Sequence, residues 1–404
     1  MKKQLFLITL LINYIGYSQT FTNYTVVDGV IPGIIYEVIQ DTNGDIWCVG
    51  WTDPDNPGIA RFDGITWTQF GIDDGPHSNT MVSCFQDSNG NYWFGSVPFF
   101  GDDGVSMFDG TTWTQFSTAD GLVGSNVEDI IEDTDGNIWF ATGDGASMFD
   151  GTTFTNYTIE DGLSSNLLTS VIQATNGDIW FSTADKGAVR FDGTTFTSIT
   201  AQNGLASDEL SRVFQDQNGD IWFSSGFSDT GLTRFDGDSF TIFTTVDGLA
   251  SNNIREIAED NDGNVWFGGS FGASRFDGTD WLVVDQSDGL LSNGIRGIEA
   301  DDEGNIWFGT FEGVSVLNAG SLSTEEENLA SFSVFPNPVQ DQLMIQSPDT
   351  SEIAKVNVYS VLGELIVSQE NTTVIDMSTL SSGIYFAKII GLNQRSNTIK
   401  VIKE

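Results

Sequence analysis

Apolar and polar residues alternate in short runs along most of this chain, and the same arrangement returns every 41 to 46 residues. Within residues 127–158, an apolar run that ends at Asp133 precedes a run that contains Trp139, and a third run ends at Asp150. The alternating, threonine-rich run Thr153–Thr158 completes the unit. Runs of β-branched and aromatic residues with a period of two are typical of strands buried on one face. The pattern therefore predicts four short strands in each unit.

An Asn-Gly or Asp-Gly dipeptide separates the first two predicted strands in most units, as at Asn43-Gly44 and Asp135-Gly136. Such dipeptides favour a two-residue hairpin, because both positions of that turn take a positive φ. We therefore predict that the first two strands of each unit form a tight two-residue hairpin.

Seven such units follow one another, and each has a glycine three residues before a tryptophan. The tryptophans are Trp47, Trp93, Trp139, Trp180, Trp222, Trp266 and Trp307. Four-stranded units of about 40 to 45 residues, repeated four to eight times, are the signature of a β-propeller. The sequence thus predicts an all-β chain with a seven-bladed β-propeller over residues 19–320. We interpret the tryptophans as packing residues between blades rather than as a sugar-stacking surface.

The seventh unit has no fourth strand of its own, because its pattern stops at Leu317. Near the other end of the chain, Phe21–Thr25 and Asp28-Gly29 repeat the fourth strand and turn seen at residues 154–162. A strand supplied from the N-terminal side would complete the last blade and remove an exposed sheet edge. We predict that the ring is closed in this way.

Both ends of the chain differ in composition from the repeats. Residues 1–18 carry two lysines, an apolar run and then small residues, which is the layout of a signal peptide. The polar stretch 321–331 predicts a linker. In residues 332–404 basic residues and strand alternation return, which predicts a small immunoglobulin-like β-sandwich. No segment reaches the roughly 20 apolar residues that a transmembrane helix needs.

The charge balance excludes two classes of partner. The chain has 57 acidic and 15 basic residues, which gives a net charge of -42. Nucleic acids and anionic membrane surfaces repel such a chain. The charge either keeps an exported protein soluble or indicates binding of divalent cations.

Calcium is the cation that the sequence suggests, because Asp41, Asn43 and Asp45 place side-chain oxygens at alternate positions. An EF-hand loop, however, has its glycine at position six and a bidentate glutamate at position twelve. Here the glycine is at position four and no such glutamate follows. We therefore expect no cofactor and interpret these residues as turn formers, with calcium as the alternative.

The two cysteines take the places of apolar residues in the repeat. Cys48 stands where the other units have phenylalanine, and Cys84 stands where they have valine or isoleucine. Free cysteine behaves as a small apolar residue. We therefore favour two core residues over a disulfide.

One repeat, at residues 162–193, reads Gly-Leu-Ser-Ser-Asn, then Gly-Asp-Ile-Trp-Phe-Ser-Thr, then Arg-Phe-Asp-Gly. This sequence resembles the two-component regulator propeller repeat of Bacteroidetes, and the resemblance covers about residues 21–317. It implies a fold used by periplasmic sensor regions of hybrid histidine kinases, many of which are thought to sense oligosaccharides. This chain shows no membrane span and no kinase segment, so we do not expect it to signal.

The C-terminal segment resembles a second family. The residues that carry the resemblance are Phe335-Pro336-Asn337-Pro338-Val339, the strand Val356–Tyr359 and the terminal Lys400–Lys403. They resemble the type A sorting domain of the type IX secretion system. The resemblance implies passage through the periplasm and across the outer membrane by that machinery, then release or attachment at the cell surface. An adhesive sandwich domain is the alternative.

Motifs for nucleophilic or zinc chemistry are missing from the sequence, which has no GxSxG, HExxH or CxxC. The single histidine, His77, falls in a predicted loop. Streptogramin lyases have a similar repeat, but the resemblance requires a catalytic histidine on an inner strand. This sequence has no histidine there, because His77 falls in a predicted loop. Carboxylate catalysis stays open, because a glycosidase needs two well-placed acids.

Loops on one face of the predicted propeller are the candidate ligand site. The connections from strand two to strand three vary in length, and variable loops on a rigid scaffold often carry function. They carry the aromatic residues Trp51, Phe99, Phe100, Phe227, Phe271 and Phe311. Near the starts of inner strands lie the charged residues Glu37, Asp129, Arg212, Arg255, Glu256 and Arg296.

The three arginines of that set, Arg212, Arg255 and Arg296, suit a carboxylate or an acidic glycan. Alternatively, the aromatic residues cap blade ends and the arginines pair with local acids. The hypothesis we favour is an exported, non-catalytic propeller that binds a glycan or protein ligand at the channel mouth. The alternative is a polysaccharide lyase or glycoside hydrolase that uses carboxylates at the same face.

Overall fold

The structure is a computed structural model that describes residues 20–53, 55–97, 104–226, 228–319, 333–346, 353–360, 365–370, 372–391 and 396–403. The chain divides into two compact units, Met1–Leu322 and Ser323–Glu404. The predicted signal peptide and linker lie outside the described residues.

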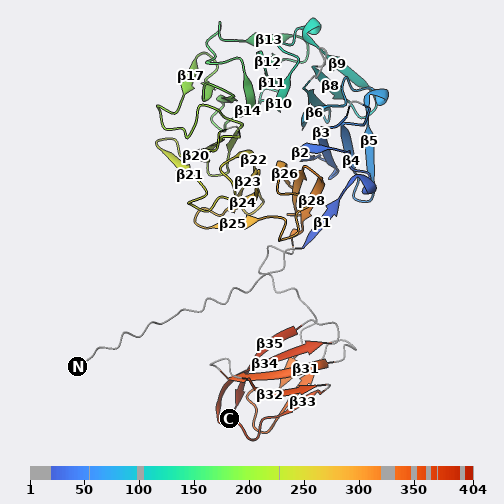
Figure 1. Cartoon of the computed structure of the whole chain (residues 1–404), viewed down its shortest axis with the longest axis vertical. Coiled ribbons are helices and arrows are strands. Elements are labelled where there is room, and N and C mark those ends of the chain that lie inside the picture. Colours follow the sequence, from blue (N-terminus) through green and yellow to red (C-terminus); the bar gives the residue numbers. More distant parts are fainter. Residues whose placement is uncertain are drawn as a thin grey trace, which may run out of the picture. The chain divides into compact units, whose positions relative to one another are not determined.

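The first unit is a ring of antiparallel four-stranded sheets around a centre (Figure 1). We number the sheets 1 to 7 by the order of their inner strands in the sequence. The inner strands are β2 (Ile34–Gln40), β6 (Met81–Gln86), β10 (Val127–Glu132), β14 (Leu168–Gln173), β18 (Arg212–Gln215), β22 (Ile254–Glu259) and β26 (Ile295–Ala300). Neighbouring inner strands contact each other round the ring, and β26 contacts β2.

The other strands of each sheet follow outward. The second strands are β3 (Ile46–Trp51), β7 (Tyr92–Ser96), β11 (Ile138–Thr142), β15 (Ile179–Thr183), β19 (Ile221–Ser224), β23 (Val265–Gly269) and β27 (Ile306–Thr310). The third strands are β4 (Ile59–Phe62), β8 (Val105–Phe108), β12 (Gly145–Phe149), β16 (Ala188–Phe191), β20 (Leu232–Phe235), β24 (Gly272–Phe276) and β28 (Gly313–Leu317). The outer strands are β5 (Trp67–Phe70), β9 (Trp113–Phe116), β13 (Phe154–Tyr157), β17 (Phe196–Ile199), β21 (Phe240–Phe243), β25 (Trp281–Val284) and β1 (Phe21–Tyr24).

Short 3-10 helices follow three of the outer strands. They are η1 (Val26–Asp28), η2 (Ile72–Asp74) and η3 (Thr118–Asp120). In each of them the third residue is an aspartate whose carboxylate accepts a hydrogen bond from the backbone N–H just before the helix. This contact fixes the direction in which the chain leaves one sheet for the next.

The turns between the first two strands differ from the predicted two-residue hairpin. In sheet 1 the N–H of Gly44 donates to the carbonyl of Asp41, and the N–H of Asp41 donates to the carbonyl of Asp45. Three residues therefore form the loop, and Gly44, with a φ of 88°, closes it as a bulge. The carboxylate of Asp41 explains the difference, because it accepts hydrogen bonds from the N–H groups of Asn43 and Asp45.

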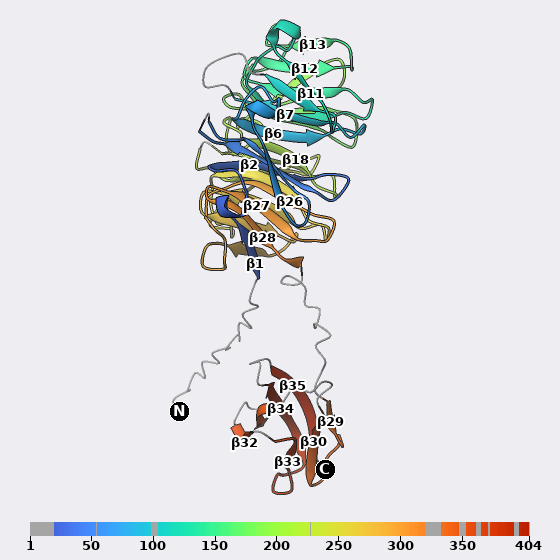
Figure 2. The ribbon, with the colours of Figure 1, turned by 90° about the vertical axis from the view of Figure 1, so that its right-hand side faces the viewer.

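An N-terminal strand closes the ring, as the sequence predicted. Strand β1 pairs with β28 in antiparallel register, with Phe21 opposite Leu317 and Tyr24 opposite Val314. The two strands lie side by side in both views of the ring (Figure 1, Figure 2). The side chain of Tyr24 stacks on Trp307, with 5° between the ring planes.

Polar side chains at the ends of the inner strands tie each sheet to the one before it. In six sheets a glutamine or glutamate accepts a hydrogen bond of 2.7 or 2.8 Å from a turn N–H of the preceding sheet. The pairs are Gln40 with Asp302, Gln86 with Thr42, Glu132 with Ser88, Gln173 with Thr134, Gln215 with Thr175 and Glu259 with Gln217. Because Gln40 reaches Asp302, the same contact joins the first sheet to the last.

Tryptophans fill the interfaces between neighbouring sheets. Trp139 of β11, for example, packs against Phe181 and Phe191 of the next sheet, with ring centroids 6.1 and 6.3 Å apart. Leu163 and Val171 belong to the same buried cluster. The tryptophans of the repeat are therefore core residues, and the ring consists of consecutive sheet-on-sheet cores.

The second unit has two antiparallel sheets. One contains β29 (Ser333–Phe335), β30 (Gln342–Gln346) and β33 (Val374–Asp376); the other contains β32 (Leu365–Glu370), β31 (Ile353–Ser360), β34 (Gly383–Gly391) and β35 (Ser396–Lys403). Both sheets contribute to one apolar core, with Leu343 and Ile345 from the first and Val356, Val358 and Ile389 from the second.

Candidate functional site

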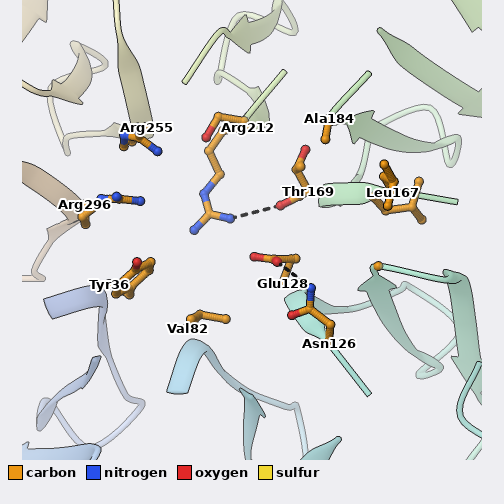
Figure 3. Close-up of a pocket in the computed structure, with 13 residues that line it drawn as sticks. Tyr36, Val82, Asn126, Glu128, Leu167, Thr169, Ala184, Arg212, Arg255 and Arg296 are labelled. Carbon is orange, nitrogen blue, oxygen red and sulfur yellow. Dashed lines mark hydrogen bonds between the residues drawn. The ribbon is translucent and has the colours of Figure 1, made fainter. Parts of the chain in front are cut away.

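One residue in most inner strands is left out of the pairing with the second strand. The omitted residues are Tyr36, Val82, Glu128, Thr169, Arg255 and Arg296. A β-bulge of this kind re-aims one side chain. All six line a single cavity of about 190 Å³ at one end of the central channel (Figure 3). Ser211, which precedes the inner strand of sheet 5, lines the same cavity.

Two arginines from neighbouring sheets lie on one side of this mouth cavity (Figure 3). The guanidinium of Arg296 lies 4.8 Å from the centroid of the Tyr36 ring and 5.7 Å from that of Phe311. Its Nε atom is buried without a hydrogen-bond partner, and Arg296 forms no ion pair with any described residue. Burial lowers the pKa of Arg255, and the nearby positive charge of Arg296 lowers it further. Both arginines would therefore gain from an anion in the cavity.

The third predicted arginine, Arg212, is already paired. Its Nε lies 2.8 Å from Oε2 of Glu256, and its Nη2 lies 3.9 Å from Oε2 of Glu37. It also donates to the carbonyl of Thr169 over 3.5 Å (Figure 3). Burial alone would lower the pKa of Arg212, but Glu256 and Glu37 outweigh burial and raise it. Arg212 lines the cavity, yet its charge is neutralised from within the channel.

The acids that follow the bulge residues on the inner strands accept hydrogen bonds from backbone N–H groups. Glu256 accepts a hydrogen bond from the N–H of Ile257, the residue that follows it. Asp129 likewise accepts from the N–H of Ile130 and, in the next sheet, from that of Val171. These carboxylates satisfy N–H groups that the interrupted pairing leaves free.

Glu128 is the one acid among the described residues that line the mouth cavity. Its Oε1 accepts a hydrogen bond of 3.1 Å from Nδ2 of Asn126 (Figure 3). Burial raises the pKa of Glu128, and the hydrogen bond from Asn126 offsets part of that effect. The cavity thus has two cations on one side and an acceptor group on the other.

The predicted aromatic residues divide into three groups. Trp51 and Phe311 are about two-fifths exposed and lie beside cavity residues, Trp51 at 6.3 Å from the Tyr36 ring centroid. Phe271 is 66% exposed and does not line the cavity. Phe99, Phe100 and Phe227 lie outside the described residues.

Tyr36 and Glu128 were not among the predicted site residues. The signal was present in the sequence, because an alignment of the seven repeats puts both in the same column as Arg255 and Arg296. The shared column indicates a site only once the β-bulge is known, because the bulge leaves these residues out of the strand pairing. No single repeat reveals the bulge.

The remaining candidates lie away from the cavity. His77 lies between β5 and β6, and its N–H donates to the side chain of Ser106. Cys48 and Cys84 are both buried and free, as expected for core residues, and burial raises the pKa of each thiol.

The predicted calcium alternative concerns Asp41, whose carboxylate is occupied by protein donors. Besides the two turn N–H groups, it accepts hydrogen bonds from Nε1 of Trp47 at 2.9 Å and from the hydroxyl of Tyr92 at 2.6 Å. Among the described residues no group of three or more acidic, histidine or cysteine side chains is arranged to hold a metal.

We therefore expect the melting temperature to stay within about 1 °C when calcium is added to the protein or removed with a chelator. The reason is that Asp41 has no free lone pair directed outward for a cation that wants six to eight oxygens. Thermal unfolding by circular dichroism measures this. A calcium-dependent rise that Asp41→Asn abolishes would restore the calcium hypothesis.

Comparison with known protein families identifies both parts of the chain. The model described as two component regulator propeller matches residues 121–144, 248–271 and 289–312. The model described as secretion system C-terminal sorting domain matches residues 333–404. The chain carries regulator-propeller repeats and a secretion sorting domain. No curated protein matches it.

Solved structures share the fold at low sequence identity. The extracellular domain of the hybrid two component system BT3049 from B. thetaiotaomicron is 18% identical, with a TM-score of 0.65 over 95% of this chain. PorZ, a surface component of the type IX secretion system of Porphyromonas gingivalis, is also 18% identical, with a TM-score of 0.58 over 92%. This chain spans only 57% and 59% of those two proteins.

A virginiamycin B lyase from Staphylococcus aureus, solved in a catalytically inactive form with quinupristin, is similar over a shorter part. It is 13% identical, with a TM-score of 0.58, over 74% of this chain and 99% of its own. At these identities the likenesses establish the propeller fold alone.

The sorting domain indicates export through the type IX secretion system, to the cell surface or out of the cell. It also implies contact with the secretion machinery. Within the part of the chain that the structure describes, no helix has the length and apolar character to cross a membrane.

Proposed function

We propose that this exported protein is a seven-bladed propeller that binds an acidic glycan at the mouth cavity without converting it. Each numbered sheet is one blade in this proposal. The propeller spans residues 19–320, the linker 321–331, and an immunoglobulin-like sandwich 332–404. The observation that carries the function is the arginine pair at the mouth, above all the buried and unpartnered Nε of Arg296.

The chemistry of the cavity supports a carboxylate-bearing ligand. In a chain with a net charge of -42, Arg255 and Arg296 stand together at one rim, and carboxylates are the usual partners of arginine. Glu128 on the other side suits a hydroxyl donor, and the exposed ring of Trp51 suits the face of a sugar. At about 190 Å³ the cavity is smaller than the roughly 300–1,000 Å³ of typical ligand pockets, so we expect it to hold one terminal residue of a longer chain.

The enzymatic alternative has weaker support. Glycoside hydrolysis commonly needs two carboxyl groups on either side of the scissile bond. Glu128 is the only acid in the described lining, whereas Asp129 and Glu256 are hydrogen-bonded to backbone N–H groups deeper in the channel. Binding without turnover is the function that this arrangement favours.

Arg296→Gln should weaken binding of the acidic glycan by about tenfold or more, because a hydrogen bond to a charged group contributes about 1.5–3 kcal/mol. A glycan array identifies the ligand, and isothermal titration calorimetry measures its affinity for each variant. Arg275→Gln is the matched control, since it removes the same charge from a residue of sheet 6 that does not line the cavity.

Two results would overturn the proposal. If Arg275→Gln weakens binding as much as Arg296→Gln, the effect comes from net charge and not from the mouth cavity. If incubation with the bound glycan releases reducing ends or unsaturated sugars, the protein is an enzyme. If the ligand that the cavity retains is a protein segment, the site stands and only the class of ligand changes.

A further inference from the structure

In six of the seven blades the tryptophan of the repeat is hydrogen-bonded to an aspartate. In each, the indole Nε1 donates to the aspartate six residues earlier, over 2.7 to 2.9 Å. The pairs are Trp47 with Asp41, Trp93 with Asp87, Trp139 with Asp133, Trp222 with Asp216, Trp266 with Asp260 and Trp307 with Asp301. The repeat thus contains a built carboxylate position beside its tryptophan.

An aromatic residue at the end of the outer strand covers the same tryptophan in five blades. The ring planes lie within 30° of parallel in each case. The stacked pairs are Trp47 with Phe70, Trp93 with Phe116, Trp139 with Tyr157, Trp222 with Phe243 and Trp307 with Tyr24. The carboxylate and the stacked ring together fill the space around the indole.

Blade 4 has a smaller residue at both positions. Ala174 replaces the aspartate, and Ile199 replaces the aromatic residue. A cleft of about 470 Å³ lies at this place, lined by Ala174, Trp180 and Ile199 of blade 4 and by Ile221, Phe235 and Phe240 of blade 5. Blade 6 has Val284 in place of the aromatic residue but keeps Asp260. In blade 4 the double replacement coincides with this cleft.

Without the aspartate, the groups that would donate hydrogen bonds to its carboxylate lack that acceptor in blade 4. Nε1 of Trp180 and the backbone N–H of Asn176 have no hydrogen-bond partner among the described residues, although the equivalent groups in blade 1 both bind Asp41. The turn itself is unchanged, since Gly177 still donates to the carbonyl of Ala174. Two donors therefore remain in the geometry that binds a carboxylate elsewhere in the ring.

The charges next to the cleft are compatible with a carboxylate. Arg190 pairs with Asp178 in blade 4, as Arg61 pairs with Asp45 in blade 1 and Arg234 with Asp220 in blade 5. Blades 1 and 5 hold their repeat aspartate beside such a pair. An anion in blade 4 would meet the same surroundings.

We propose that the cleft beside Trp180 binds a small carboxylate with an apolar body, of the arylacetate class. The carboxylate takes the place of the missing aspartate and accepts hydrogen bonds from Trp180 and Asn176. The apolar body occupies the space that Ile199 leaves and packs on Phe235 and Phe240. This site is separate from the mouth cavity and does not depend on the function proposed for it.

The test titrates the whole exported chain with phenylacetate and with phenylacetamide, its neutral analogue, by calorimetry and by Trp fluorescence. We expect phenylacetamide to bind about tenfold more weakly or worse, because it lacks the charge that the donors recognise. Ala174→Asp should abolish phenylacetate binding, since its own carboxylate fills the site. Ala119→Asp adds the same charge at an exposed position of blade 2 and should leave binding unchanged.

Arg296→Gln separates this site from the mouth cavity, and phenylacetate binding should survive it. Equal affinity for the acid and the amide would overturn the proposal without any variant. Undiminished binding to a folded Ala174→Asp protein, or loss of binding in Arg296→Gln, would place the ligand elsewhere and overturn it too. No detectable binding at millimolar phenylacetate has the same consequence.

Discussion

Removal of residues 20–28 lowers the melting temperature of the propeller by more than about 10 °C, because it takes the outer strand from the blade that closes the ring. The deletion removes the ladder between β1 and β28 and the Phe21 and Tyr24 side chains. Loss of a well-packed aromatic side chain costs about 3–5 kcal/mol, and one kcal/mol corresponds to about 2–4 °C in a large domain. Differential scanning calorimetry measures the shift.

The structural reason is that Tyr24 belongs to two blades at once. Its ring stacks on Trp307 in blade 7 and lies 5.1 Å from the ring of Phe62 and 5.7 Å from that of Trp67 in blade 1. Without β1, the apolar core between the first and last blades is opened to water. The joint then depends on the contacts of β2 with β26, β27 and β28 and on the hydrogen bond between Gln40 and Asp302.

Val27→Ala is the control within the same segment. Its side chain is 93% exposed, so its truncation should move the melting temperature by less than about 1 °C. Tyr24→Ala should reproduce a large part of the deletion. A truncated protein that unfolds at the temperature of the full chain would contradict closure by β1.

The fold could be predicted from the sequence because the repeat itself supplies the comparison. Trp139 and its six equivalents fixed the spacing, and Phe21–Thr25 revealed the missing strand by its likeness to residues 154–158. The turn at Asp41 was predicted wrongly for a local reason. Asn-Gly propensity describes a bare backbone, whereas here a carboxylate one position before the turn stabilises a longer loop.

The candidate site was only partly predictable, because bulges and side-chain pairing depend on three-dimensional register. Arg212 and Arg296 look alike in the sequence, yet the first is neutralised by Glu256 and the second has an unpartnered Nε. A shift of one residue decides which side chain faces the mouth and which faces the channel. The replacement of aspartate by Ala174 was visible in the repeat, but its consequence appears only when the position of Ile199 beside Trp180 is known.

Asp41→Ala lowers the free energy of unfolding by about 3 kcal/mol or more. Its carboxylate accepts hydrogen bonds from the buried indole of Trp47, from the hydroxyl of Tyr92 in the next blade and from two turn N–H groups. A buried donor left without a partner costs about 1–3 kcal/mol, and this variant orphans at least two. Urea unfolding at pH 7 measures the loss, and Asp73→Ala, at an exposed carboxylate, is the control of equal charge.

The loss from Asp41→Ala should also depend on pH. Burial raises the pKa of Asp41, but the hydrogen bonds from Tyr92, Trp47 and the two turn N–H groups together outweigh burial, so its pKa lies below the ordinary value. A carboxyl with a lowered folded-state pKa stabilises the fold above its unfolded pKa of about 3.9, and that contribution fades as the pH falls through the folded value. The difference between the wild type and Asp41→Ala should therefore be constant from pH 6 to 8 and shrink below about pH 4. A difference that grows on acidification would mean that Tyr92 and Trp47 do not stabilise the ionised form of Asp41.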